Sequence, residues 1–482
     1  MTGIENDRQD VPKDGRSGTV IRSPAMGDWA SSGDLTHAKR TDLVIAAATE
    51  VQARFNAFSE IDVEGARATA RQLDAAGAGG TASGPLAGVA VSVKDILDVA
   101  GLPTRWGSEL FRNAAPAKAD LAAVARLRQA GAVVLAKTTT TEFAHAPLGY
   151  SPLTGLTKNP WNEDVTAGGS SSGAGVAVAT GATPIALATD AGCSTRLPAA
   201  CTATFGLKPT LGLIPHERVP EAFGNFIHLG LLARTVGELA QTLPIVAGAH
   251  PADPQGLGRA EPVRPTGNVL EGTRVVRWRT VGNRMVSGEV DAALERSVAA
   301  LRGLGATVIP EACPLPNPDP TWITLQQANW AARFANLSEE ERTRISPTLR
   351  AGIDRGLAAS AVDLQRALIR RTAIFREVQS VFLDRADFIL TPAFSARPVA
   401  ALHGIDEPLV IDGVELGNLR SEWVPYLSLF DLSGHPAIAM PAGLTDDGVP
   451  LGVQLVAPWH GDFALLAAAS AFEAALPPPR LA

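Results

Sequence analysis

The chain has 482 residues, of which 46% are hydrophobic and 19% charged, a balance typical of globular proteins rather than disordered ones. Its formal net charge of −7 is spread along the chain, which argues against a nucleic-acid partner or an anionic membrane surface. Three cysteines are too few for a disulfide framework and lack metal-site spacing, and no apolar run is long and pure enough to span a bilayer. We therefore expect a soluble protein of a reducing compartment, the cytoplasm.

Residues 1–34 are polar and rich in Gly, Ser, Asp and Arg, without the apolar core of a signal peptide. We expect a mobile arm there and one folded domain over 35–482. Near Leu35 apolar residues begin to recur at the spacing of a helix: Leu43, Val44, Ala47, Val51 and Phe55.

A unit of helix, glycine and short apolar strand occurs at least twice further along. In the first, Asp120 is expected to cap a helix that ends at Gly131, before a strand over 132–136. In the second, a helix over 290–301 precedes a strand over 307–309. Further strands are predicted at 89–93, 275–278, 388–390, 437–440 and 452–456. This alternation of helices and short strands predicts an α/β fold: a single large domain with a central, mostly parallel or mixed β-sheet covered by helices. The Pro/Gly-rich stretch 250–267 is a surface loop or a boundary between halves, and the loop interpretation is favoured.

Three consecutive serines, 170–172, lie among glycines in VTAGGSSSGAGVAVATG. The apolar residues that follow exclude a flexible linker, and a phosphate-binding loop would need a lysine where Ala174 stands. The segment also fits the GxSxG nucleophile elbow with Ser171 at its centre, but no strand precedes it, as that motif requires. A serine esterase that uses Ser171 therefore stays open as a rival interpretation.

Two lysines stand at strand ends and could serve as a base. In GVAVSVKDI, strand alternation places Lys94 on the face of Ala90 and Ser92, which suits an ammonium in a tight pocket, and points Asp95 elsewhere. Lys137 in VVLAKTT has a similar place, so the residues alone do not separate the two. A second glycine-flanked serine, Ser194, lies in TDAGCSTRLPAA.

Together, Lys94, TAGGSSSGAG and ATDAGCSTRLPAACTATFGLKPT resemble the amidase signature family of serine hydrolases. Ser170 and Ser194 are 24 positions apart, as the paired serines of that family are, and Lys94 lies 76 positions before Ser170. Segments from about residue 83 to 475 support the resemblance, among them SGPLAGVAVSVKD, FILTPAF, SGHPAIAMPAG and PLGVQLVAP.

The resemblance implies that Ser194 is the nucleophile, Ser170 the bridging serine that follows a cis peptide bond, and Lys94 the base. It implies amide hydrolysis through an acyl-enzyme, with no metal or cofactor. Backbone N–H groups of the oxyanion hole would come from Ala191, Gly192, Cys193 and Ser194. Supporting roles would fall to Thr189, Asp190, Arg196 and Ser171, with Ser172 as a further hydrogen-bond donor.

Cys193 stands where the family usually has glycine, so a positive φ there would be strained, and its thiol could block the site when oxidised or alkylated. The substrate is expected to be a small amide, with aryl or acyl amides as the leading interpretation. Aromatic residues of 320–345 and 400–430 and near them would line the acyl pocket or belong to the core: Trp322, Trp330, Phe394, Trp423 and Tyr426.

Three alternatives remain: a hydrolase of urea- or carbamate-like substrates, a non-catalytic binding subunit or a glutamine-dependent amidotransferase subunit. A homodimer is possible.

Overall fold

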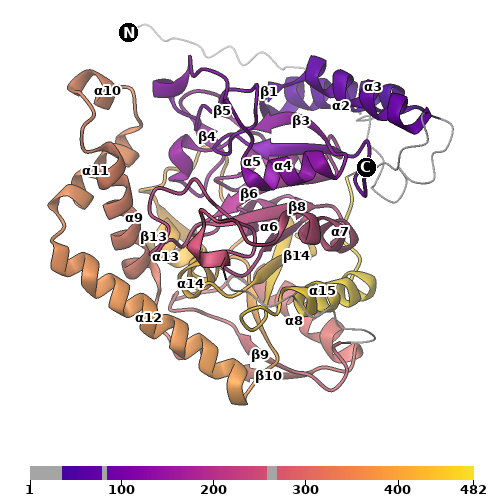
Figure 1. The fold of residues 1–482 in the computed structure, drawn as a ribbon. Helices are drawn as coiled ribbons and strands as arrows, with labels where there is room; N and C mark the ends of the chain where they lie inside the picture. Colours follow the sequence, from indigo (N-terminus) through magenta and orange to yellow (C-terminus); the bar gives the residue numbers. More distant parts are fainter. Residues whose placement is uncertain (1–34, 79–83, 258–268, 482) are drawn as a thin grey trace, which may run out of the picture.

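Apolar strands from both ends of the chain assemble into one mixed sheet of 11 strands (Figure 1). The computed structural model describes residues 35–78, 84–257 and 269–481, so the expected N-terminal arm lies outside the described residues. In spatial order the strands are β1 (Phe58–Ile61), β3 (Val133–Thr138), β2 (Ala90–Lys94), β6 (Ile185–Asp190), β8 (His228–Ala233), β7 (Phe205–Lys208), β14 (Ala437–Leu444), β15 (Pro450–Val456), β11 (Phe388–Pro392), β9 (Arg274–Trp278) and β10 (Thr307–Glu311).

Parallel pairing is confined to two groups of strands, β3–β2–β6 and β11–β9–β10, and every other pair is antiparallel. The expected fold is confirmed, and of the two expected arrangements, mostly parallel or mixed, the sheet has the mixed one. Antiparallel strands need only a short connection, and β14 reaches β15 through residues 445–449. The sheet also joins strands from both sides of 250–267, so this stretch does not divide the chain into halves.

Helices cover the sheet and extend beyond it on one side, where α9 to α12 gather away from α2 and α3 (Figure 1). The helices are α2 (His37–Phe55), α3 (Val63–Ala78), α4 (Ala122–Gln129), α5 (Ser172–Ala179), α6 (Arg196–Cys201), α7 (Val236–Val246), α8 (Gly288–Gly303), α9 (Asp319–Phe334), α10 (Glu339–Thr343), α11 (Pro347–Ala358), α12 (Ala361–Asp384), α13 (Leu419–Trp423), α14 (Pro425–Ser433) and α15 (Asp462–Ala475). Two small sheets pair β4 (Tyr150–Ser151) with β5 (Gly155–Leu156) and β12 (Pro408–Ile411) with β13 (Val414–Asn418).

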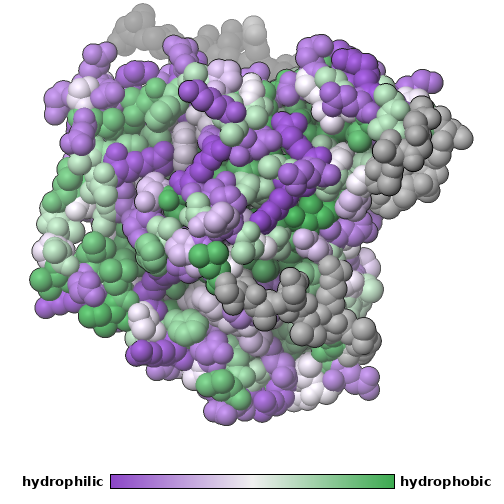
Figure 2. All heavy atoms as spheres, viewed as in Figure 1, coloured by the Kyte–Doolittle hydropathy of each residue, from purple (hydrophilic) through white to green (hydrophobic). Residues whose placement is uncertain are grey.

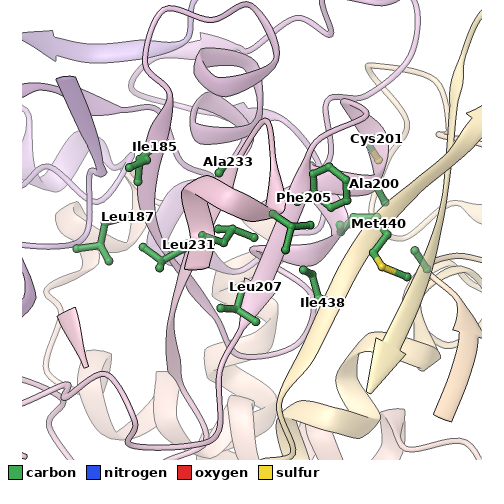
Figure 3. Close-up of a cluster of buried hydrophobic side chains, with 14 of the residues drawn as sticks. Ile185, Leu187, Ala200, Cys201, Phe205, Leu207, Leu231, Ala233, Ile438 and Met440 are labelled. Atoms are coloured by element: carbon green, nitrogen blue, oxygen red, sulfur yellow. The ribbon is translucent and has the colours of Figure 1, made fainter. Parts of the chain in front are cut away.

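Side chains from the central strands and from α6 pack together in the hydrophobic core (Figure 3). Figure 3 shows Ile185 and Leu187 of β6 together with Leu207 of β7, Leu231 of β8 and Ile438 of β14, all buried. On the face shown in Figure 2, hydrophilic and hydrophobic residues are mixed. Helices α11 and α12 carry exposed apolar residues such as Leu357 and Ile369. None of the helices in the described ranges is both long and apolar enough to cross a membrane.

Most of the helices and strands expected from the sequence are present, but the expected cap of helix α4 is wrong. The helix expected from about residue 35 is α2, and its Val44, Val51 and Phe55 are buried. Asp120 does not cap α4: its carboxylate accepts from the Ala100 N–H at 2.7 Å and pairs with Arg128 at 3.1 Å. The Asp120 carboxylate therefore binds these two groups and not the N-terminus of α4, which was the partner expected from the sequence.

Candidate active site

Two adjacent parallel strands, β2 and β6, end at the same edge of the sheet and bring their terminal residues together. Lys94 ends β2, is fully buried, and its Nζ lies 2.6 Å from Ser170 Oγ and 3.0 Å from Thr189 Oγ1. Burial lowers the pKa of Lys94 to about 7, although Asp190 and Cys193 oppose this shift. A lysine in this place is substantially neutral near pH 7, which is the form that can accept a proton.

The second lysine, Lys137, lies in a different environment. Its Nζ pairs with Asp95 Oδ1 at 3.1 Å and also donates to Pro103 O and Thr104 Oγ1. The alternation of β2 therefore does separate Asp95 from Lys94, as the sequence predicts. Lys137 forms a buried structural ion pair, and of the two lysines it is Lys94 that contacts Ser170.

The triple-serine turn connects Lys94 to the second serine loop. The peptide bond between Gly169 and Ser170 is cis, and Ser171 donates its backbone N–H to Ser194 O at 3.2 Å. A Cβ on Gly169 would lie 2.2 Å from Leu148 O, so only glycine fits there. Ser171 Oγ donates to Thr189 O at 3.4 Å. The hydroxyl of Ser172 is buried without a hydrogen-bond partner among the described residues, so the expected donor role of Ser172 is wrong.

Ser194 lies between the end of β6 and the start of α6, in a loop held by Asp190. The carboxylate of Asp190 accepts from the backbone N–H groups of Thr195 and Arg196 at 3.1 and 3.2 Å and from Arg196 Nε at 2.8 Å. Burial opposes the ionisation of Asp190, but the Arg196 guanidinium outweighs it and lowers the pKa. Within the described ranges, the backbone N–H groups from Ala191 to Ser194 make no hydrogen bond, so these donors are available to an incoming oxyanion.

Cys193 carries neither of the problems expected of it. Its φ is not positive, so the backbone accepts a side chain there without strain. The thiol is 1% exposed and lies 3.6 Å from Gly169 O, and burial raises its pKa to about 11. Because the thiolate is the reactive form, burial and the raised pKa both disfavour reaction at the Cys193 thiol.

Sequence reasoning missed a buried polar network behind the Ser194 loop. Arg196 also donates to Asp431 Oδ2 and to Gln454 Oε1, both at 2.6 Å, and His228 lies 3.4 Å from Asp431. Burial lowers the pKa of Lys208 to about 7, and this residue donates to His435 O at 2.5 Å. The signal for these residues was a polar side chain inside an apolar run, as for Asp431 in PYLSLFDLS and for Gln454 in LGVQLV.

A cavity of about 380 Å³ lies over Ser194, which is 8% exposed. Its walls include Trp106, Phe143, Trp322, Trp330 and Phe334. Trp322 and Trp330 therefore line the pocket as the sequence suggested, whereas Phe394, Trp423 and Tyr426 are core residues. Trp322 is fixed to the loop that carries Ser194 by its Nε1, which donates to Ala191 O at 2.5 Å. In the described part of the chain, no group of three or more His, Cys, Asp or Glu side chains is arranged to hold a metal ion.

Comparison with known proteins identifies the family. The amidase family model matches residues 40–466. An acylamidase of Rhodococcus erythropolis is 31% identical over 95% of this chain and 96% of its own length, and a glutamyl-tRNA(Gln) amidotransferase subunit of Roseiflexus castenholzii is 32% identical over 92% and 94%. The crystal structure of a bacterial aryl acylamidase superposes with a TM-score of 0.87 at 26% identity and covers 95% of this chain and 97% of that one.

The chain belongs to the amidase signature family. It is an amide-hydrolysing enzyme with the fold of that family.

Proposed function

We propose that this enzyme hydrolyses its amide through an acyl-enzyme on Ser194, with Ser170 relaying protons to Lys94. The observation that carries the proposal is the buried Lys94 amine, 2.6 Å from Ser170 Oγ and with its pKa lowered to about 7. A free lysine would be almost entirely protonated at that pH and could not act as the base.

In the first half-reaction, Ser170 gives its hydroxyl proton to Lys94 Nζ and takes the proton of Ser194 Oγ. Ser194 Oγ attacks the amide carbonyl carbon, and the tetrahedral intermediate places negative charge on the carbonyl oxygen. The C–N bond then breaks as Ser170 returns a proton to the leaving amine and is itself resupplied by Lys94. Water attacks the acyl-enzyme by the same relay and releases the carboxylic acid.

The oxyanion is stabilised by backbone N–H groups between Ala191 and Ser194. Each preorganised donor contributes roughly 3–4 kcal/mol to the stability of such a transition state. Thr189 helps hold Lys94, while Asp190 and Arg196 hold the loop in shape through the contacts described above.

The substrate proposed is a small aryl or acyl amide, cleaved by the chain without a partner subunit. The volume of about 380 Å³ suits a small molecule, and the aromatic walls suit an aryl or hydrocarbon group. We also propose that the protein is cytoplasmic and that it can form a homodimer. Light scattering of the purified protein would test its oligomeric state.

A fluorophosphonate probe followed by peptide mapping tests the nucleophile. We expect label on Ser194, weakened in Lys94→Ala and Ser170→Ala, and still located on Ser194 in Ser171→Ala as long as that variant remains folded. The loss of Ser194 itself should abolish hydrolysis of 4-nitroacetanilide. Label on Ser171 instead would overturn the assignment in favour of a nucleophile elbow.

An amidotransferase subunit is the second candidate, because the Roseiflexus protein of that kind is as similar in sequence as the acylamidase. Ammonia release from glutamine distinguishes the two. A free-standing amidase should turn over anilides faster than glutamine, whereas glutamine as the preferred substrate would favour the amidotransferase interpretation.

A further inference from the structure

One wall of the cavity holds an arginine that forms no ion pair with any residue the structure describes. Arg420, in α13, is 6% exposed and lines the same cavity as Ser194. Among the described residues, its Nη1 has no hydrogen-bond partner, and no carboxylate forms an ion pair with its guanidinium. A buried charge without a partner is unfavourable by several kcal/mol, so the position calls for a counter-charge.

Trp322 connects Arg420 to the loop that carries the reacting serine. The guanidinium carbon is 3.8 Å from the centre of the Trp322 ring, and the indole nitrogen of Trp322 donates to Ala191 O in the nucleophile loop. The acidic residue Asp319 acts on Arg420 electrostatically: burial raises the pKa of Asp319, and the charge of Arg420 partly opposes this rise, but the two side chains form no ion pair.

The other charges in the wall leave the cavity with an excess of positive charge. Arg333 is stacked on Trp106 with its guanidinium carbon 4.0 Å from the ring centre, and Arg218 is paired with Asp98. The one acidic lining residue, Glu221, accepts from the backbone N–H groups of Phe223 and Gly224. His216 also lines the cavity, and burial lowers its pKa to about 4, so it is neutral at pH 7.

We propose that Arg420 binds a carboxylate carried by the substrate, so that the preferred substrates are small amides that also bear a carboxylate group. The guanidinium fork matches a carboxylate in two parallel hydrogen bonds, and stacking on Trp322 fixes the orientation of the fork. The aromatic walls would hold the rest of the molecule. This inference rests on the proposed function only in placing the scissile amide at Ser194.

Matched substrates test it without any variant. In the first pair, N-succinyl-4-nitroanilide carries a carboxylate on the acyl side where N-butyryl-4-nitroanilide has a methyl group. In the second pair, 4-acetamidobenzoate carries a carboxylate on the amine side where 4-methylacetanilide has a methyl group. In at least one pair we expect kcat/KM to be roughly 10- to 100-fold higher for the carboxylate, the range of a charge-assisted hydrogen bond. Equal values in both pairs, or a preference for the neutral compounds, would overturn the proposal.

The arginine is tested by the ratio of kcat/KM within the preferred pair. Arg420→Gln should bring this ratio close to one, and Arg420→Lys should retain part of it because the charge remains. Arg366→Gln, on the exposed face of α12, is the matched control and should leave the ratio unchanged. A full preference in Arg420→Gln would assign Arg420 to positioning Trp322 only.

Calorimetry separates this inference from the proposed function. Ser194→Ala should bind the uncleaved carboxylate substrate, and the double variant Ser194→Ala/Arg420→Gln should bind it at least roughly tenfold more weakly. Binding that depends on Arg420 in a protein that cleaves no amide would refute only the proposed function. Hydrolysis at Ser194 with no carboxylate effect would refute only the role of Arg420. Circular dichroism of each variant distinguishes lost binding from lost folding.

Discussion

Replacing Lys94 by methionine should stabilise the protein while it removes the proposed base. Methionine keeps an unbranched side chain and removes the amine. The fall in the pKa of Lys94 from 10.5 to about 7 corresponds to about 5 kcal/mol of unfavourable free energy in the folded state. The lost hydrogen bonds to Ser170 and Thr189 offset about 2 kcal/mol of this. We therefore expect the free energy of unfolding at pH 7 to rise by roughly 3 kcal/mol, with no remaining activity.

The gain should depend on pH in a defined direction. In the unfolded chain Lys94 keeps its proton up to about pH 10.5, whereas in the folded protein it loses it near pH 7. The unfolded state therefore binds more protons between these values, and the Lys94 contribution to wild-type stability rises with pH. The advantage of the variant should shrink by about 2 kcal/mol between pH 7 and pH 9. Lys208 is present in both proteins, so its own titration cancels in the difference.

Urea unfolding at pH 7, 8 and 9 measures these differences, with Lys137→Met as the control. Lys137 is as buried as Lys94 but is paired with Asp95, so its removal leaves a buried carboxylate unpaired. We expect this control to lose about 3–5 kcal/mol. The reasoning would be refuted if Lys94→Met were as unstable as Lys137→Met, or if its advantage did not change with pH.

Three further predictions concern the site. The value of kcat/KM should rise with pH to a plateau with a midpoint near 7, because Lys94 must lose its proton to act as the base. At pH 6 it should be roughly tenfold below the plateau. A flat profile from pH 6 to 8 would contradict the role of Lys94. Gly192→Ala should lower kcat/KM at least roughly tenfold, since its Cβ would lie 2.8 Å from the Trp322 ring, whereas Gly303→Ala, with open space around it, should have no effect on the same assay. Iodoacetamide at pH 7.5 should leave Cys193 of the native protein unmodified and full activity remaining, and mass spectrometry showing alkylated Cys193 with loss of activity would count against its buried, protonated state.

Several features of this protein are fixed locally and could be predicted from the sequence. Helical spacing of apolar residues located α2, and glycine-punctuated apolar runs located β3, β9, β10, β11, β14 and β15. The side on which Lys94 lies followed from the alternation of β2, because successive side chains of a strand point to opposite faces. The motifs around Ser170 and Ser194 gave the family. Each of these signals extends over a short stretch of chain.

Contacts between distant segments decided the rest. Strand position alone does not distinguish Lys94 from Lys137, whereas the fold pairs Asp95 with Lys137; whether Cys193 is strained depends on its φ, which the fold sets outside the positive range. Asp431 and Gln454 carry no local sign that they meet Arg196, which is 235 and 258 positions away. The same holds for Arg420, whose neighbour Trp322 comes from α9. The charge state and reactivity of these groups depend on burial and on neighbours that only the folded chain brings together, because desolvation and partner charges set the free energy of a buried ion.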